Sequence, residues 1–214
     1  MKNFILLLIT IFLTSCETAV VEEVATNGEP EGPHTSAEWK IWAYSTAAPS
    51  FIAAECTVID TDGTVLREGT NGWTAMAANP NGAPSDPENG WKDPHEAMPM
   101  VGDAASFAWL QAFMAGEVPE VELDGWAWML HGDLGEDNRM YLVIDEEGIA
   151  KAKADGQWIE SGAHLMLFPA DPSTLDGQTT NFNTGAPYVM YAGTKYAHLM
   201  IPVEGYYDYQ APVK

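Results

Sequence analysis

The second half of the chain consists of short apolar runs separated by turn-forming residues. Glycine, proline, asparagine and aspartate lie between the runs, and each of these residue types favours turns. Short apolar runs between such turns are typical of strands. Five strands are therefore predicted, over residues 125–131, 140–144, 163–168, 188–192 and 197–203.

A helical spacing occupies residues 104–115, where Phe107, Leu110 and Met114 recur every three or four positions. This period places the three side chains on one face of a helix. Asp103 is a suitable N-cap, and Gly116 is a suitable helix end. Because further apolar residues widen the apolar face, we expect this helix to be buried.

The first half of the domain predicts a shorter helix and a hairpin. Ser36 can cap a helix that contains Trp39. Two apolar segments flank an Asp-Gly turn at residues 62–63, as in a β-hairpin. Strands outnumber helices, so we expect an α+β fold. The prediction is a single domain over residues 36–214, with a mainly antiparallel sheet and two or three helices.

The N-terminus has the pattern of an export signal. Lys2 precedes an apolar run that ends in Leu13-Thr14-Ser15-Cys16. The run is too short to span a membrane, because a spanning helix needs about 20 apolar residues. The last four residues resemble the lipobox of bacterial lipoproteins. The resemblance implies that a signal peptide, residues 1–15, is removed, and that Cys16 receives a diacylglycerol and a further acyl chain such as palmitate. We therefore expect an exported protein that is lipid-anchored to a membrane of the cell envelope, facing either the periplasm or the cell surface.

Residues 16–35 are rich in glutamate, glycine and proline and show no apolar periodicity. This composition predicts an acidic, flexible linker between the anchor and the domain. Three further stretches, 62–73, 185–190 and 193–198, are similar to a set of exported bacterial proteins of comparable length. That resemblance implies export and a shared single-domain fold, and it supplies no catalytic residue.

The charge of the chain restricts its partners. The formal net charge is −22 at pH 7, and the few basic residues are scattered. Nothing in this pattern could line a phosphate backbone, so nucleic-acid binding is not expected. Cys56 is the second of two cysteines, so lipidation of Cys16 would leave no partner for an intramolecular disulfide. The expected partners are a membrane, through the lipid anchor, and a small ligand or metal ion.

Three of the predicted strands each carry a histidine and a methionine two positions apart. Residues i and i+2 of a strand share a face, so each pair should point the same way. Imidazole and thioether groups together suit copper, particularly Cu(I). If the three strands are neighbours, these groups could form a copper site, and a nearby segment with His95, Met98 and Met100 could add a ligand. The candidate ligands are Met129 with His131, His164 with Met166, and His198 with Met200.

Several other interpretations remain open. A packed core that contains isolated histidines and gap-filling methionines would show the same pattern. The acidic loop 131–138 could bind Ca²⁺ weakly, and Trp126 with Trp128 could stack on a sugar. No familiar catalytic motif occurs in the sequence. A ligand-binding domain is therefore preferred over an envelope hydrolase of unrecognised type and over a purely structural or interaction domain.

Overall fold

The protein is described by a computed structural model that covers residues 28–140 and 145–208. The predicted signal peptide, Cys16 and most of the predicted linker lie outside the described residues. The greater part of the strand predicted at 140–144 also lies outside them.

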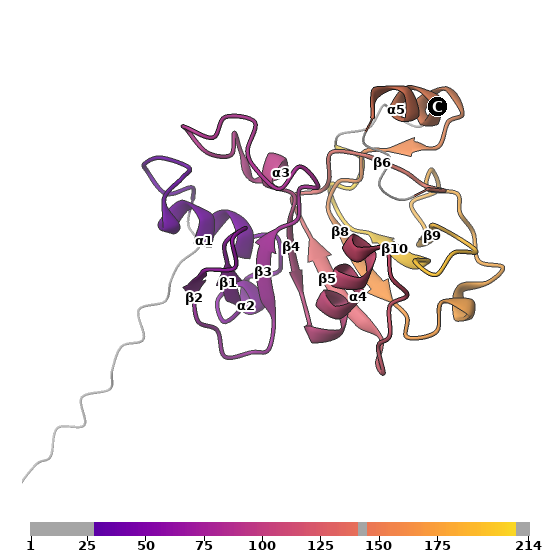
Figure 1. Ribbon diagram of the computed structural model, residues 1–214, viewed down its shortest axis with the longest axis horizontal. Coiled ribbons are helices and arrows are strands. Elements are labelled where there is room, and N and C mark those ends of the chain that lie inside the picture. Colours follow the sequence, from indigo (N-terminus) through magenta and orange to yellow (C-terminus); the bar gives the residue numbers. More distant parts are fainter. Residues whose placement is uncertain (1–27, 141–144, 209–214) are drawn as a thin grey trace, which may run out of the picture.

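An eight-stranded sheet runs through the molecule in the order β2-β1-β3-β4-β5-β8-β10-β9 (Figure 1). Neighbouring strands are antiparallel, except that β1 and β3 are parallel. The predicted α+β fold with a mainly antiparallel sheet is thus confirmed. The strands are β1 (Thr57–Ile59), β2 (Val65–Arg67), β3 (Thr74–Ala77), β4 (Pro99–Gly102), β5 (Gly125–Met129), β8 (His164–Phe168), β9 (Tyr188–Met190) and β10 (His198–Pro202). A separate two-stranded sheet pairs β6 (Glu136–Asp137) with β7 (Trp158–Ile159).

Five α-helices occur among the described residues, which is more than the two or three predicted. Three of the five were not expected. Two of these three have four residues each and are too short to show a helical period in the sequence. The third unexpected helix, α5, follows Asp145, whose side chain caps it by accepting the N–H of Gly148. The helices are α1 (Ala37–Ser45), α2 (Ser50–Ala53), α3 (Pro94–Ala97), α4 (Ala104–Ala115) and α5 (Glu146–Ala154), and a 3₁₀ turn covers Pro172–Leu175. No helix within the described ranges is long and apolar enough to cross a membrane.

Helix α4 has the bounds and caps that its sequence predicts. Asp103 accepts the N–H of Ser106, and Gly116 ends the helix with a φ of 72°. The first turn of α4 lies directly on the sheet, because Gly102 and Gly125 offer no side chain there: a Cβ at either would collide with Ser106. The expected burial is only partial, since just two α4 residues are fully buried. The helix covers a cavity with one side and faces solvent with the other.

Helix α1 packs on the opposite face of the sheet, against β3 and β4. The side chains alternate along β4, so Met100 belongs to the core on the α4 side and Val101 to the core under α1. The segment just before α1 also contacts the domain, because the ring of His34 stacks on Trp39 at 4.2 Å. His34 Nδ1 lies 2.5 Å from the carbonyl oxygen of Trp91. Contacts with the domain therefore begin before residue 36.

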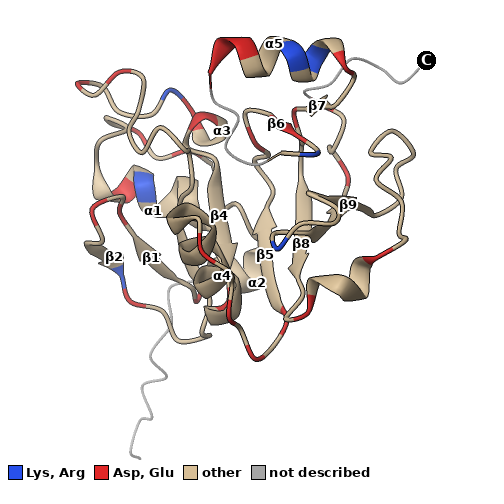
Figure 2. Ribbon diagram, turned by 45° about the vertical axis from the view of Figure 1, so that its right-hand side comes forward, with Lys and Arg blue, Asp and Glu red and all other residues tan. Residues whose placement is uncertain are grey.

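Acidic residues lie mainly on loops and at helix ends (Figure 2). Helix α5 shows a clear order, with Glu146 and Glu147 in its first turn and Lys151 and Lys153 in its last. Each sign of charge lies at the end of the helix dipole that stabilises it. These four charged residues of α5 all lie on the surface.

Candidate functional site

Most methionines of the protein surround one cavity. The chain has 10 methionines, and eight of them line a cavity of about 130 Å³ between the sheet, α4 and the segment 133–140. Methionine commonly fills gaps in a core, but here the side chains surround a gap that stays open. They are Met98, Met100, Met114, Met129, Met140, Met166, Met190 and Met200.

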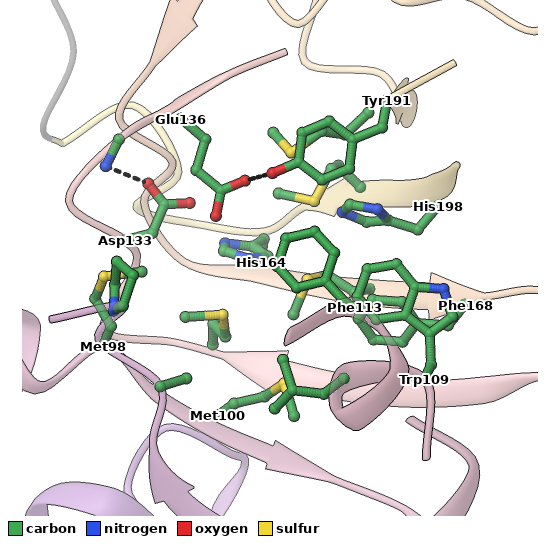
Figure 3. A pocket seen from close by; sticks show the side chains of 18 of the residues that line it. Met98, Met100, Trp109, Phe113, Asp133, Glu136, His164, Phe168, Tyr191 and His198 are labelled. Carbon is green, nitrogen blue, oxygen red and sulfur yellow. Dashed lines mark hydrogen bonds between the residues drawn. The ribbon is translucent and has the colours of Figure 1, made fainter. Parts of the chain in front are cut away.

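Two histidines project into this cavity from adjacent strands, as Figure 3 shows. His164 and His198 stand at equivalent positions of the repeated sequence Ala-His-Leu-Met. Their local geometry is also equivalent: His164 Nδ1 lies 2.6 Å from the carbonyl oxygen of Gly162, and His198 Nδ1 lies 3.0 Å from that of Tyr196. A carbonyl oxygen only accepts, so Nδ1 carries the proton in both rings and Nε2 keeps a lone pair.

Burial keeps both imidazoles neutral. His164 is 0% exposed and His198 is 4% exposed. Burial lowers the pKa of each ring to about 4. The Nε2 atom of His164 is buried and has no hydrogen-bond partner among the described residues. An unpaired buried polar atom costs about 1–3 kcal/mol, so a ligand at this nitrogen would remove that cost.

The register of the sheet sets which groups are neighbours on the cavity floor. Met129 of β5 pairs with His164 of β8, and Met166 pairs with Met200 of β10. Paired residues point to the same face with Cβ atoms about 4.5–5.5 Å apart. His164 itself pairs with Pro202, four residues beyond His198 on β10. With a rise of about 3.4 Å per residue, the Cα atoms of the two histidines are roughly 14 Å apart. The two rings therefore occupy different ends of the cavity, with thioethers between them.

Of the six candidate ligands, His131 alone is not part of the cavity lining. Strand β5 ends at Met129, so the alternation that would have aligned His131 with Met129 stops there. His131 Nε2 instead lies 2.8 Å from Thr46 Oγ1, and its carbonyl oxygen lies 2.7 Å from His95 Nδ1. The structure gathers the other five candidates, Met129, His164, Met166, His198 and Met200, around the cavity.

Two carboxyl groups border the same cavity. Asp133 Oδ1 accepts the backbone N–H groups of Gly135 and Ser161 at 3.0 and 2.9 Å. The hydroxyl of Tyr191 donates to the carboxyl of Glu136, and Figure 3 shows both carboxyl groups above the His164 ring. Burial raises the pKa of Asp133 to about 7 and that of Glu136 to about 8, and the charge of Asp133 adds to the shift at Glu136. This pair therefore retains protons near neutral pH.

Aromatic rings close the other end of the cavity. Trp109 and Phe113 of α4 stack with ring centroids 5.2 Å apart, and Trp109 also lies 4.3 Å from the ring of Phe168. The ring of His198 is 5.4 Å from Trp109 and 5.2 Å from Tyr191. His198 is therefore held among aromatic rings, whereas His164 lies nearer the carboxyl groups.

The backbone is unusual at two residues that line the cavity. Met98 and Tyr191 have φ values of 47° and 55°, and they are the non-glycine residues with positive φ in the described part of the chain. Such conformations cost of order 1–3 kcal/mol and tend to occur at functional sites. Their position is an independent reason to regard this cavity as the site.

A metal ion bound by carboxylates or histidines alone is not supported. Within residues 28–140 and 145–208, no group of three His, Cys, Asp or Glu side chains is arranged to hold a metal ion. In the acidic loop, Asp133 is already hydrogen-bonded and Asp137 pairs with Arg139 at 3.0 Å. The other soft or borderline donors that line the cavity in the described part of the chain are the thioethers of its methionines.

The chain matches no protein-family model, and no curated protein or solved structure matches it. The function must therefore be inferred from the geometry of the cavity.

Parts of the cavity were not recognisable from the sequence. Met190, Met114 and Met140 were not among the candidate ligands, because none has a histidine two positions away in its predicted element. Glu136 stands in the acidic loop 131–138, for which the sequence suggested only weak Ca²⁺ binding, and Tyr191 carried no signal. The proximity of Tyr191 to Glu136 joins segments that are 55 residues apart, which no local pattern reveals.

Proposed function

We propose that the domain binds Cu(I) in the methionine-lined cavity. The observation that carries the proposal is the buried, unpartnered Nε2 of His164, which belongs to a cavity lined by eight methionines. The proposed ligands are His164 Nε2 and the thioethers of Met129 and Met166. Met129 is the cross-strand neighbour of His164, and Met166 follows His164 on the same face of β8.

The chemistry of these groups favours Cu(I) over harder ions. Thioether sulfur is a soft ligand that selects Cu(I), and imidazole binds copper readily. Metal-bound histidines usually donate their other ring N–H to a carbonyl or carboxylate, which orients the ring. The hydrogen bond from His164 Nδ1 to Gly162 is of this kind. The ring is also neutral at physiological pH, so no proton competes for Nε2.

Anaerobic titration of the purified protein with Cu(I), in competition with the chromophore bicinchoninate, tests the proposal. The His164→Gln variant should lose at least about tenfold in affinity, or about 1.4 kcal/mol. His131→Gln is the matched control, because His131 lies outside the cavity lining, and its affinity should equal that of the unmodified protein. X-ray absorption of the complex should show both sulfur and nitrogen ligands. Equal affinities for the two variants would refute the assignment.

We further propose that the protein is an exported lipoprotein of the cell envelope, anchored through Cys16. Support comes from the apolar N-terminal run and from Leu13-Thr14-Ser15-Cys16. The experiment is metabolic labelling of the full chain with radioactive palmitate in a bacterial host. The Cys16→Ser variant should lose the label, and the Cys56→Ser variant should keep it. Label that persists in Cys16→Ser would contradict the anchor.

A hydrolase is the second candidate, and the carboxyl pair favours it. Carboxyl groups whose pKa is raised by burial are frequent at catalytic sites. A cavity of about 130 Å³ admits a small substrate rather than a polymer chain. Turnover of small ester, amide or glycoside substrates that disappears in Glu136→Gln would support an enzyme. Absence of turnover in the unmodified protein would count against this second candidate.

A further inference from the structure

The methionines of the cavity divide into two groups by exposure. Six are almost fully buried, with exposures between 1% and 6%. The remaining two, Met114 and Met140, are 55% and 60% exposed. We call these two the rim methionines. They are the methionines among the large exposed apolar residues of the described chain, and both belong to the lining of this one cavity.

The rim methionines stand on well-anchored backbone. Met114 lies in the last full turn of α4, just before Gly116, whose carbonyl oxygen accepts a hydrogen bond from Lys195 Nζ at 2.7 Å. Met140 follows a tight turn in which its N–H donates to the carbonyl oxygen of Asp137 at 3.2 Å. The Arg139–Asp137 ion pair stabilises that turn.

Burial does not account for methionine at these positions. An apolar side chain that stays half exposed gains only part of the free energy that burial provides. Leu134, in the segment that follows β5, is also exposed and also lines the cavity. Three exposed apolar side chains therefore belong to the cavity lining, and the two thioethers among them come from separate elements.

We propose that Met114 and Met140 receive Cu(I) from a donor molecule and pass it to the inner ligands. This inference rests on the proposed Cu(I) site. In each step a Cu–S bond to a rim methionine forms while a bond from copper to the donor breaks, and the next exchange moves copper to an inner ligand. Copper remains Cu(I) throughout, so no electron and no proton needs to be supplied. The rim methionines control the rate of transfer, and the inner ligands control the affinity.

Stopped-flow transfer of Cu(I) from its bicinchoninate complex to the ligand-free protein tests this role. In the double variant Met114→Leu, Met140→Leu, leucine keeps the volume and removes the sulfur. The rate of transfer should fall by about tenfold, while the equilibrium affinity stays within about twofold of the original. Met76→Leu is the matched control, because Met76 is half-buried and does not belong to the cavity lining. Its rate should be unchanged.

The outcomes separate this inference from the Cu(I) site itself. An unchanged rate in the double variant would overturn the role of the rim methionines and leave the inner site intact. A loss of equilibrium affinity equal to the loss of rate would also overturn it, because the rim would then belong to the final site. If the unmodified protein takes up no Cu(I), the proposed function fails, and this inference fails with it.

Discussion

The two cores on opposite faces of the sheet are built from different residues. The core under α1 contains six buried alanines and, among the described residues, no methionine. The core on the α4 side contains six buried methionines and one alanine, and it encloses the cavity. Alanine has no side-chain freedom, so α1 can pack closely on β3 and β4. Methionine has three rotatable bonds and adapts to irregular space. The comparison indicates that the core under α1 is closely packed, whereas the core on the α4 side leaves a cavity.

The largest expected effect is a difference in how the two cores tolerate a changed side chain. Ala43 is 0% exposed under α1, so Ala43→Leu should lower the free energy of unfolding by about 1–3 kcal/mol through overpacking. Met166→Leu preserves volume beside a cavity and should cost less than about 1.5 kcal/mol. Urea denaturation measures both changes. If Met166→Leu lowers the free energy of unfolding at least as much as Ala43→Leu, the cavity core tolerates a changed side chain no better than the core under α1.

The next effect concerns pH and belongs to the cavity core. Asp133 and Glu136 have folded-state pKa values of about 7 and about 8, above their unfolded values. The folded state therefore holds protons that the unfolded state releases, and stability is lost as pH rises toward 8. Burial lowers the pKa values of His131, His164 and His198 to about 4. Because of these three groups, stability should increase as pH rises, but only up to about pH 6.5.

Between about pH 6.5 and pH 8 the carboxyl pair, rather than the histidines, should determine how stability changes with pH. The free energy of unfolding should fall by about 1–2 kcal/mol per pH unit in this window. Glu136→Gln removes one of the two groups and should flatten the slope. The measurement is urea denaturation at a series of pH values. Identical slopes in the two proteins would show that Glu136 does not titrate in this range.

The smallest effect compares the caps of the two helices. Ser36 caps α1 through one hydrogen bond, to the N–H of Trp39. Asp103 caps α4 by accepting the N–H of Ser106, and its second oxygen accepts the N–H of Trp126 on β5. Loss of an N-cap typically costs about 0.5–2 kcal/mol. Asp103→Ala should therefore cost more than Ser36→Ala in thermal or urea unfolding. Equal costs would mean that the link from Asp103 to β5 adds nothing to the position of α4.

Local patterns were sufficient to predict several elements. The spacing of Phe107, Leu110 and Met114 predicted α4, and Asp103 and Gly116 marked its two ends. Alternation also placed His164 with Met166, and His198 with Met200, on one face of their strands. These features depend on residues a few positions apart, so the sequence displays them directly.

Other features of the site depend on long-range pairing. The carboxyl pair, Asp133 and Glu136, lies close to Tyr191 only because the segment after β5 folds over the cavity. His131 was grouped with Met129 on the assumption that the strand continues, but β5 ends two residues earlier. A strand end depends on its partner strands, and partners distant in sequence cannot be read from a local pattern.

The sequence by itself determined which side chains share a face of each strand, because that alternation is a property of the extended backbone. It also determined the acidic balance and the position of the lipobox-like segment. Only the tertiary structure decided that β5, β8 and β10 are neighbours, that five of the six candidate ligands border one cavity and that His131 does not. The physical reason is that strand order and register come from contacts between distant segments, whereas side-chain direction comes from the geometry of each residue.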